Sequence, residues 1–159
     1  MPGKVIGRKM NIGFIGTMSR SSDNVVVNRV AKEQISFGDV VVLNEDNTVS
    51  PFDFSGDENQ NIIGIAVRII KQEMDIRGQV AYLADEAVDI LSRGSITILS
   101  DGSNLVAGGK VYIYNSDKGI TYTGNGTNQE AKLINNMVFT TGGVDGNNTA
   151  EVTILERKA

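Results

Sequence analysis

The residues best suited to chemistry are three carboxylates, Asp85, Glu86 and Asp89, which lie close together in the chain. Most glycoside hydrolases use a pair of carboxylates that face each other across a cleft, one as the acid and one as the nucleophile or base. Nothing in the spacing places two of these three on opposite walls of a cleft. We therefore interpret them as a solvated acidic edge and keep a hydrolase as the minor alternative.

Two oxygen-rich stretches could bind a cation: "NEDNT" at residues 44–48 and "NSDKG" at residues 115–119. A helix–loop–helix calcium loop needs carboxylates at fixed offsets and a closing bidentate Glu, and neither stretch supplies them. The run "NIGFIG" (residues 11–16) is similar to the start of a dinucleotide-binding fingerprint, but Met18 and Ser21 stand where further glycines are needed. The sequence therefore predicts no metal site and no cofactor.

The chain contains no His and no Cys. Their absence removes imidazole acid–base chemistry, thiol nucleophiles, thiolate metal sites and disulfides. Tyr112 and Tyr114 lie two positions apart and share one face of a predicted strand. This favours a core or subunit contact, with stacking on sugar rings as the alternative. We expect a binding or structural protein and not an enzyme.

The elements that must position these residues are short strands. Apolar segments rich in β-branched and aromatic residues recur along the chain, separated by Gly, Asn, Asp and Ser. This pattern predicts an all-β, jelly-roll-like sandwich or barrel. Residues 80–87 stay open between helix and strand, and "VDILSRGSITIL" (residues 88–99) predicts a strand, a turn and a second strand. "IIGIAVRII" (residues 62–70) predicts one strand covered on both faces, in which Gly64 marks a bulge or a close backbone approach.

Two similar 13-residue stretches occur in the chain, "GDVVVLNEDNTVS" at residues 38–50 and "GKVYIYNSDKGIT" at residues 109–121. Each copy contains a strand, an Asn-x-Asp turn and a returning strand, so the sequence predicts two β-hairpins. Gly119 and Asn47 are the candidates for a left-handed residue, and the two turns are expected to differ by one residue. The repeat could reflect a pseudo-symmetric sandwich or two independent solutions to one problem.

The net charge of −4 hides an asymmetry along the chain. Residues 1–22 contain four Lys and Arg and no acid, whereas the remainder contains eleven Lys and Arg against nineteen Asp and Glu. We predict an extended basic N-terminal arm over residues 1–23 and a β-sandwich or barrel body over residues 24–159. The acidic body argues against nucleic acid as a partner, and the lack of a long apolar run argues against a membrane span.

Three stretches carry a resemblance to a known family: "GDVVVL" (residues 38–43), "IIGIAVR" (residues 62–68) and "AVDILSRGSITIL" (residues 87–99). Together they resemble the head-decoration, or cement, proteins of tailed bacteriophages, over roughly residues 25–115. The resemblance implies a β-barrel or jelly-roll body, commonly trimeric. Such a body sits outside a capsid at junctions between major capsid subunits and clamps them against internal pressure.

By this resemblance the partners are the major capsid protein and further copies of the chain, with a homotrimer favoured. The protein is expected on the capsid exterior of the virion after synthesis in the bacterial host cytoplasm. The candidate contact residues are Lys4, Arg8, Lys9 and Arg20, chosen by charge, and Phe14 as an apolar anchor. The alternatives are another phage structural role, in a tail, baseplate or fibre, and a glycan-binding β module.

Overall fold

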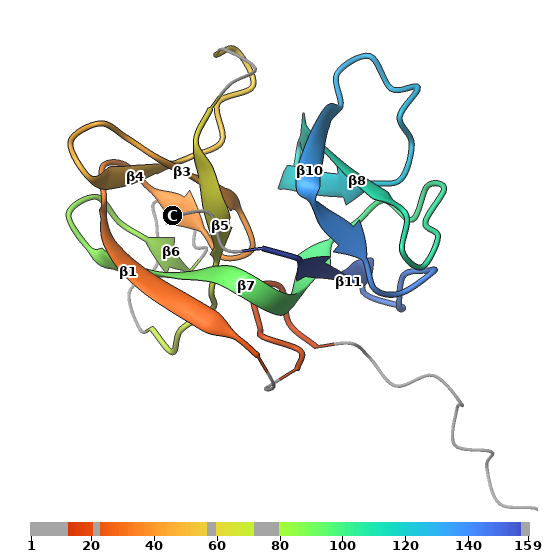
Figure 1. Cartoon of the computed structure of the whole chain (residues 1–159), viewed down its shortest axis with the longest axis horizontal. Helices are drawn as coiled ribbons and strands as arrows, with labels where there is room; N and C mark the ends of the chain where they lie inside the picture. The colour runs from red at the N-terminus through yellow and green to blue at the C-terminus, as the bar shows by residue number, and fades with distance from the viewer. Residues whose placement is uncertain (1–12, 21–22, 57–59, 72–79, 157–159) are drawn as a thin grey trace, which may run out of the picture.

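The computed structural model describes residues 13–20, 23–56, 60–71 and 80–156. Within these ranges every regular element is a strand, and no helix is long and apolar enough to cross a membrane (Figure 1). The all-β prediction is therefore confirmed. The described strands are β1 (Val25–Ala31), β2 (Ile35–Ser36), β3 (Val40–Leu43), β4 (Thr48–Pro51), β5 (Ile62–Ala66), β6 (Ala81–Tyr82), β7 (Ala87–Leu99), β8 (Lys110–Ser116), β9 (Gly119–Thr123), β10 (Lys132–Phe139) and β11 (Thr149–Ile154).

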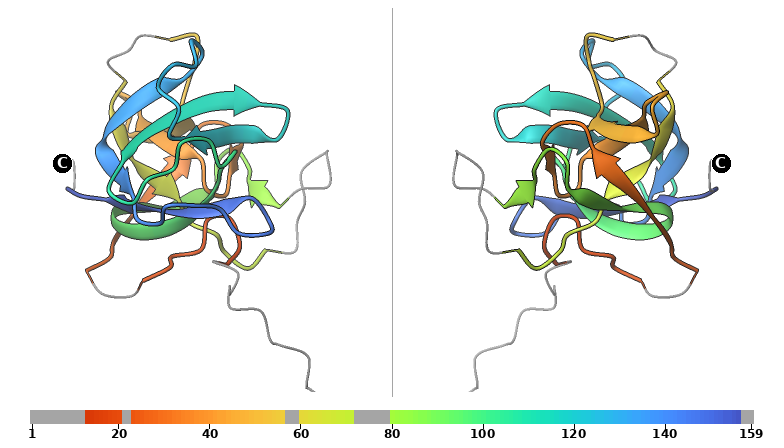
Figure 2. Two further views of the ribbon diagram at one scale, coloured as in Figure 1. Left: turned by 90° about the vertical axis from the view of Figure 1, so that its right-hand side faces the viewer. Right: turned by 90° about the vertical axis from the view of Figure 1, so that its left-hand side faces the viewer.

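The first half of the chain closes into a barrel. Strands β1, β4, β3, β5 and β7 are neighbours in this order, and β1 also pairs with β7, so the ring is complete (Figures 1 and 2). The β1–β4 pair is parallel, and the other pairs of the ring are antiparallel. Closure gives most of these short strands a neighbour on both sides, which is how barrels limit exposed strand edges.

Strand β7 belongs to both halves of the molecule. Its residues from Ala87 to Arg93 pair with β1, and those from Gly94 to Leu99 pair with β11, from which the second sheet continues through β10 and β8 to β9. The predicted turn at this point is wrong, because the strand continues through it from Ala87 to Leu99. Gly94 has a φ of 126° and would collide with Asn24 if it carried a Cβ, so this glycine lets the strand bend without reversing.

The open segment 80–87 forms the short strand β6 followed by a turn. The Leu83 N–H donates to Glu86 Oε2 at 2.7 Å, and Asp85 adopts a left-handed φ of 68°. A side chain that bonds nearby backbone in this way competes with helical hydrogen bonding. Strand β6 pairs with β2 as a separate two-stranded sheet, so the helical alternative is wrong.

Both predicted hairpins are present, as β3–β4 and β8–β9. In the first, the Asn44 N–H donates to the Thr48 carbonyl at 2.9 Å around three intervening residues; in the second, Ser116 lies opposite Gly119 around two. The turns thus differ by one residue, as predicted. Asn47 and Gly119 adopt the left-handed conformation, with φ of 64° and 99°.

Strand β5 contains the predicted irregularity at Gly64. Its register with β3 shifts at this point, leaving Ile63 as an extra residue, and a Cβ on Gly64 would overlap the Leu91 carbonyl oxygen. The bulge and the close backbone approach are both confirmed. The strand ends at Ala66, however, and Ile70 is fully exposed, so the prediction of a covered strand up to residue 70 is wrong at its end.

The two halves share one hydrophobic core. The larger buried cluster joins side chains of β3 and β5 with those of β7, β8, β10 and β11, for example Val40, Ile98 and Phe139. A second cluster, which includes Ile35 and Tyr82, gathers strands β1 to β7. The molecule is therefore held together across β7 by side-chain packing as well as by the strand itself.

Candidate functional site

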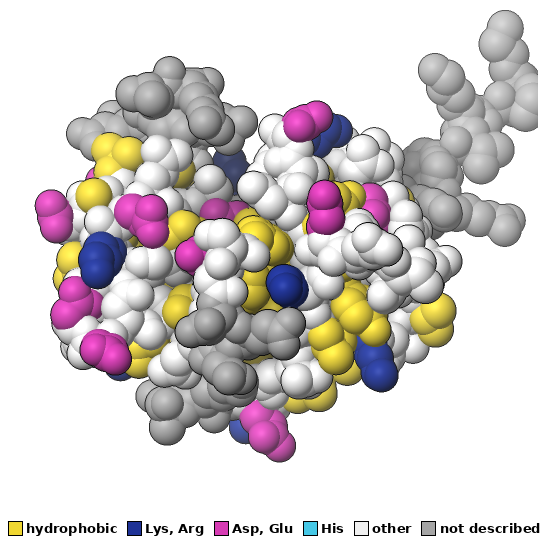
Figure 3. Space-filling model, turned by 90° about the horizontal axis from the view of Figure 1, so that it is seen from above, with side chains coloured by type: hydrophobic (Ala, Val, Ile, Leu, Met, Phe, Trp, Pro, Cys, Tyr) yellow, Lys and Arg dark blue, Asp and Glu magenta, His cyan; other side chains and the backbone are white. Residues whose placement is uncertain are grey.

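The surface seen from above is mixed. Figure 3 shows apolar, acidic and basic side chains interspersed on this face, with no broad area of one sign of charge. The distribution of charge therefore does not identify a binding site on this face, and the contacts of individual side chains must be used to find one.

The three carboxylates singled out in the sequence have three different surroundings. Glu86 pairs with the Lys71 ammonium, and this hydrogen bond lowers the pKa of Glu86. Asp89 accepts a hydrogen bond from Asn28, and Asp85 is exposed in a turn. Over the described ranges, no group of three or more His, Cys, Asp or Glu is placed to hold a metal ion. The cluster in sequence is therefore not a shared catalytic cleft.

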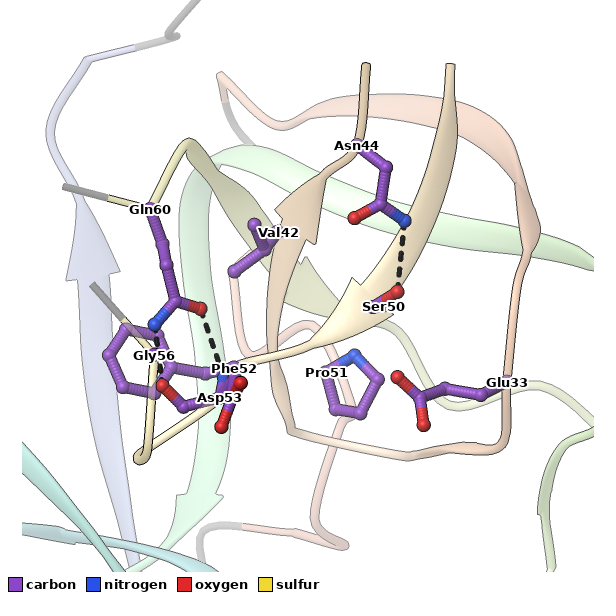
Figure 4. Close-up of a pocket in the computed structure, with 9 residues that line it drawn as sticks. All are labelled: Glu33, Val42, Asn44, Ser50, Pro51, Phe52, Asp53, Gly56 and Gln60. Atoms are coloured by element: carbon purple, nitrogen blue, oxygen red, sulfur yellow. Dashed lines mark hydrogen bonds between the residues drawn. The ribbon is translucent and has the colours of Figure 1, made fainter. Parts of the chain in front are cut away.

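A broad hollow of about 730 Å³ lies over β3 and β4 (Figure 4). Its two carboxylates, Glu33 and Asp53, lie on either side of Pro51. Asp53 accepts hydrogen bonds from the Ser55 hydroxyl and N–H, which lower its pKa, so it is ionised at neutral pH and is not a proton donor there. The Asp53 N–H in turn donates to Gln60 Oε1 at 3.0 Å. The polar lining suits hydrogen bonding to a ligand better than acid–base chemistry.

The N-terminal segment that the structure describes, Gly13–Arg20, lies along β7. The Gly16 N–H donates to the Thr97 carbonyl at 2.8 Å, and the Thr97 N–H donates to Thr17 at 2.9 Å. The Ser19 N–H donates to Ser95 at 3.0 Å. In Figures 1 and 2 this segment lies below β7. The last part of the predicted arm is therefore bonded to the body; the division at residue 23 stays a prediction.

Of the five predicted contact residues, Lys4, Arg8 and Lys9 lie outside the described residues. Arg20 forms an ion pair with Glu151 of β11, with 2.9 Å between Nε and Oε1. The Glu151 side chain is only 8% exposed and the Arg20 side chain 60%. The Nε–H of Arg20 thus holds the N-terminal segment to the body, while the rest of the guanidinium is accessible to a partner.

Phe14, the fifth residue, is 73% exposed. The Arg68 guanidinium carbon lies 5.3 Å from the Phe14 ring centroid and 5.4 Å from that of Phe37, so it contacts both rings. Ile70 follows two residues later and is fully exposed. We call the contact of Phe14 with Arg68, together with the exposed Ile70 that follows Arg68 in the chain, the aromatic–basic patch. Cation–π contacts of this kind hold an exposed ring in place before a partner arrives.

Sequence reasoning missed Arg68 and Ile70 because they end an apolar run that was interpreted as a covered strand. The signal that could have found them is the arginine itself, since an unpaired guanidinium is almost never fully buried. An Arg placed between Val67 and Ile69 thus marks the point at which one face of the chain becomes exposed.

A smaller hollow of about 280 Å³ adjoins the patch and contains a carboxyl group, that of Asp39. Its Oδ2 accepts a hydrogen bond from the Ser36 N–H at 3.1 Å. Burial raises the pKa of Asp39 to about 7, against the lowering effect of that hydrogen bond. Arg68 and Lys118 also line this hollow. Sequence reasoning missed Asp39 because it follows Gly38 as an ordinary polar residue at the start of a strand.

The tyrosine pair is engaged by the chain itself. Both rings are half-buried, and the Tyr114 hydroxyl donates to Asp101 Oδ2 at 3.2 Å. A Cβ on Gly126 would lie 2.6 Å from the Tyr112 hydroxyl, so the loop that contains this glycine closes tightly on the ring. This packing favours the interpretation as a structural contact over that of an open platform for sugar rings.

Comparison with known proteins gives a decisive match. A family model described as structural cement protein (E217 gp24/Pam3 gp6) matches residues 1–155. The chain belongs to this family. The resemblance noted in the sequence to phage cement proteins is confirmed, and the match extends to the C-terminal strands that the resemblance did not cover.

A solved structure with the same fold comes from a virus particle. A chain of the structure titled "The capsid of Myoviridae Phage XM1" is similar with a TM-score of 0.73 and 18% sequence identity, and the match covers 97% of each chain. A search among curated proteins gives no match.

Proposed function

We propose that this cement-family protein binds the outer surface of a phage capsid at junctions between major capsid subunits and stabilises the head. The observation that carries the proposal is the family match over residues 1–155. The similarity of the fold to a chain from a phage capsid supports it. In this proposal the protein works by contact area and has no catalytic step, as expected for a family of structural proteins.

We propose the aromatic–basic patch and the N-terminal segment as the capsid contact. Phe14 and Ile70 offer exposed apolar area, and Arg68 offers a cation already held between two rings. Aromatic and Arg residues of this kind are enriched among the residues that dominate binding energy at interfaces. Arg20 adds a second accessible cation on the same N-terminal segment. Lys4, Arg8 and Lys9 extend the proposed contact along the arm by charge alone.

The test uses phage heads that lack this protein. We expect saturable binding of the full chain and a rise in the temperature at which heads lose their DNA. Phe14→Ala and Ile70→Ala should each weaken binding about tenfold, which corresponds to about 1.4 kcal/mol. Val106→Ala is the matched control, because Val106 is 63% exposed and lies outside the patch.

Two results would count against the proposal. Absence of saturable binding to heads would remove the capsid function, and microscopy that locates the protein on a tail, baseplate or fibre would replace it. Equal binding by the patch variants, the control and the parent chain would leave the capsid function but remove the patch from it.

A further inference from the structure

A groove runs between β5 and β10, on the side of the molecule opposite the N-terminal segment. Two hollows of about 290 and 500 Å³ form it, and they share Ile62 on one wall with Leu133 and Asn135 on the other. Figure 1 shows β5 and β10 facing each other above β7 and β11. The walls are mainly apolar side chains and amides, with two side chains of opposite charge, Asp53 and Lys132, in the larger hollow. Such a lining suits an extended polypeptide.

Within the described part of the chain, the end of each wall strand lacks a strand neighbour on the side of the groove. Strand β5 is registered with β7 only at Ile65 and Ala66, so Ile62 has no strand partner on that side, and its N–H donates to the Gln60 carbonyl at 3.0 Å. Strand β10 is registered with β11 only from Met137 to Phe139. Leu133 therefore pairs with β8 on one side and faces the groove on the other. Unpaired edges are templates for an added strand, whose backbone supplies the missing hydrogen bonds.

We infer that this groove binds residues 1–12 of a second copy of the chain as an added strand. The first described residue, Gly13, lies beside Thr97 on β7, and Figures 1 and 2 place this segment below β7, whereas the groove opens above it. Twelve extended residues span at most about 40 Å. To reach the groove of its own body, this segment would have to pass around β7 and β11; a second copy can present its groove directly.

The composition of residues 1–12 fits the groove. This stretch contains no acidic residue, and in an extended strand Ile6 can pack against Ile62 and Leu133 while Val5 points to the opposite face. Asp53 lies at the wide end of the groove and offers a carboxylate to one of the three cations of the stretch. An added strand would thus gain backbone pairing, apolar contact and one charge contact.

The arrangement has a consequence for assembly. The donor segment and the acceptor groove lie on opposite sides of the body, so the contact is heterologous. Each copy inserts its residues 1–12 into the groove of one neighbour and accepts the same segment from another. Such contacts form a ring when the rotation between copies closes, and the homotrimer expected from the resemblance would be one such ring. The inference is independent of capsid binding through the aromatic–basic patch. For Lys4, Arg8 and Lys9 it is the alternative to the capsid contact proposed from charge.

The absence of cysteine makes a clean cross-linking test possible. Ile6→Cys and Asn135→Cys are introduced into separate full-length chains, one of them isotopically labelled, and the two are mixed under mild oxidation. We expect a disulfide that joins one labelled and one unlabelled chain. In place of Asn135→Cys, Val106→Cys, an exposed position outside the groove, should give at least tenfold less of the mixed product.

A second pair of variants tests the groove itself. Leu133→Asp should lower the cross-link yield at least tenfold and reduce the oligomer mass seen by light scattering, while Val106→Asp should leave both unchanged; both side chains are exposed, so neither change empties the core. The inference is overturned if no mixed cross-link forms either in solution or on heads. It is also overturned if a chain that carries both Ile6→Cys and Asn135→Cys forms the disulfide within itself, or if Ile6→Cys links to a capsid protein. Head binding is scored separately by co-sedimentation.

Discussion

Asp39 is a single carboxyl group with a large effect on how stability depends on pH. Its pKa is raised by burial to about 7, from an ordinary value of 3.8. Between these values the folded chain keeps a proton that the unfolded chain releases. The stability contributed by this proton is complete below about pH 4 and is lost as the pH rises towards 7. The neighbouring Tyr122, whose hydroxyl donates to the Gly38 carbonyl at 2.7 Å, has its pKa raised by burial and by Asp39, so it stays neutral there.

We predict that the free energy of unfolding falls between pH 5 and pH 7, by at most about 1.4 kcal/mol per pH unit. Asp39→Asn keeps an oxygen for the Ser36 N–H but cannot ionise, so its profile should be flatter. Urea unfolding at several pH values measures this. Asp117→Asn, a change in an exposed turn, is the control and should keep the parental slope. Equal slopes for Asp39→Asn and the parent chain would contradict the assignment.

The prediction is limited to pH 5–7 because other carboxyl groups change the free energy of unfolding in the opposite direction at lower pH. The pKa values of Asp46, Asp53 and Glu86 are lowered by hydrogen bonds, first of all from Thr48, Ser55 and Lys71. Their stabilising contributions are present above their ordinary pKa values and are lost as the pH falls below about 4. Above pH 5 these three groups are ionised in both the folded and the unfolded chain, so they do not mask the effect of Asp39 on stability.

The sequence predicted the conformation of single residues correctly where that conformation depends on the residue itself. Asn47 and Gly119 were predicted as left-handed turn residues because turn chemistry depends on the residue itself. The pKa of Asp39 depends instead on burial, and the hollow that contains Asp39 is also lined by Arg68 and Ile120 from distant segments of the chain. No pattern in the residues around Asp39 encodes those neighbours.

At the scale of elements, β5 is constrained most tightly. It lies between β3 and β7, and Gly64 is the point where its backbone comes closest to the Leu91 carbonyl. We predict that Gly64→Ala destabilises the protein by about 3 kcal/mol or more, because backbone on both sides prevents relief of the overlap. Gly146→Ala, with no atom within 4 Å of the new Cβ, should change stability by less than about 1 kcal/mol. Chemical unfolding of both variants tests this; a tolerated Gly64→Ala would show that β5 can move.

The element predictions failed where one strand serves two sheets. The Arg-Gly pair in β7 has the composition of a turn, and a turn was predicted. In the fold, Arg93 pairs with β1 while Gly94 begins the pairing with β11, so continuing hydrogen bonds favour a bend over a reversal. The hairpins were predicted because both of their strands are adjacent in sequence, whereas the partners of β7 come from both ends of the chain.

For the whole molecule, the shared core predicts one cooperative unfolding transition. The larger cluster joins Val40 of the barrel to Phe139 of the second sheet, and Ile98 of β7 belongs to the same cluster. Ile98→Ala should lower stability by about 2–5 kcal/mol while both halves still unfold together. Scanning calorimetry should give equal calorimetric and van't Hoff enthalpies of unfolding for the parent chain and for Ile98→Ala. Two resolved transitions would show that the barrel and the second sheet are separate folding units.

The candidate site was predictable only in outline. Composition indicated a binder without acid–base chemistry, and Phe14 and Arg20 were chosen from the order of residues in the arm. The structure adds what this order does not contain: Arg68 is brought over Phe14 from 54 residues away, and Glu151 reaches Arg20 across 131 residues. Contacts at such separations follow from the closure of the barrel and the return of β11.

The bonding of the N-terminal segment along β7 also determines how the molecule would carry tension. If residues before Gly13 were anchored on a neighbour, a pull parallel to β7 would load the hydrogen bonds of Gly16, Thr17 and Ser19 in shear, so that they resist together and do not open one at a time. The strain would pass into the one strand that both sheets share. Expansion of the capsid beneath the protein would then be opposed by both sheets, because β7 connects them.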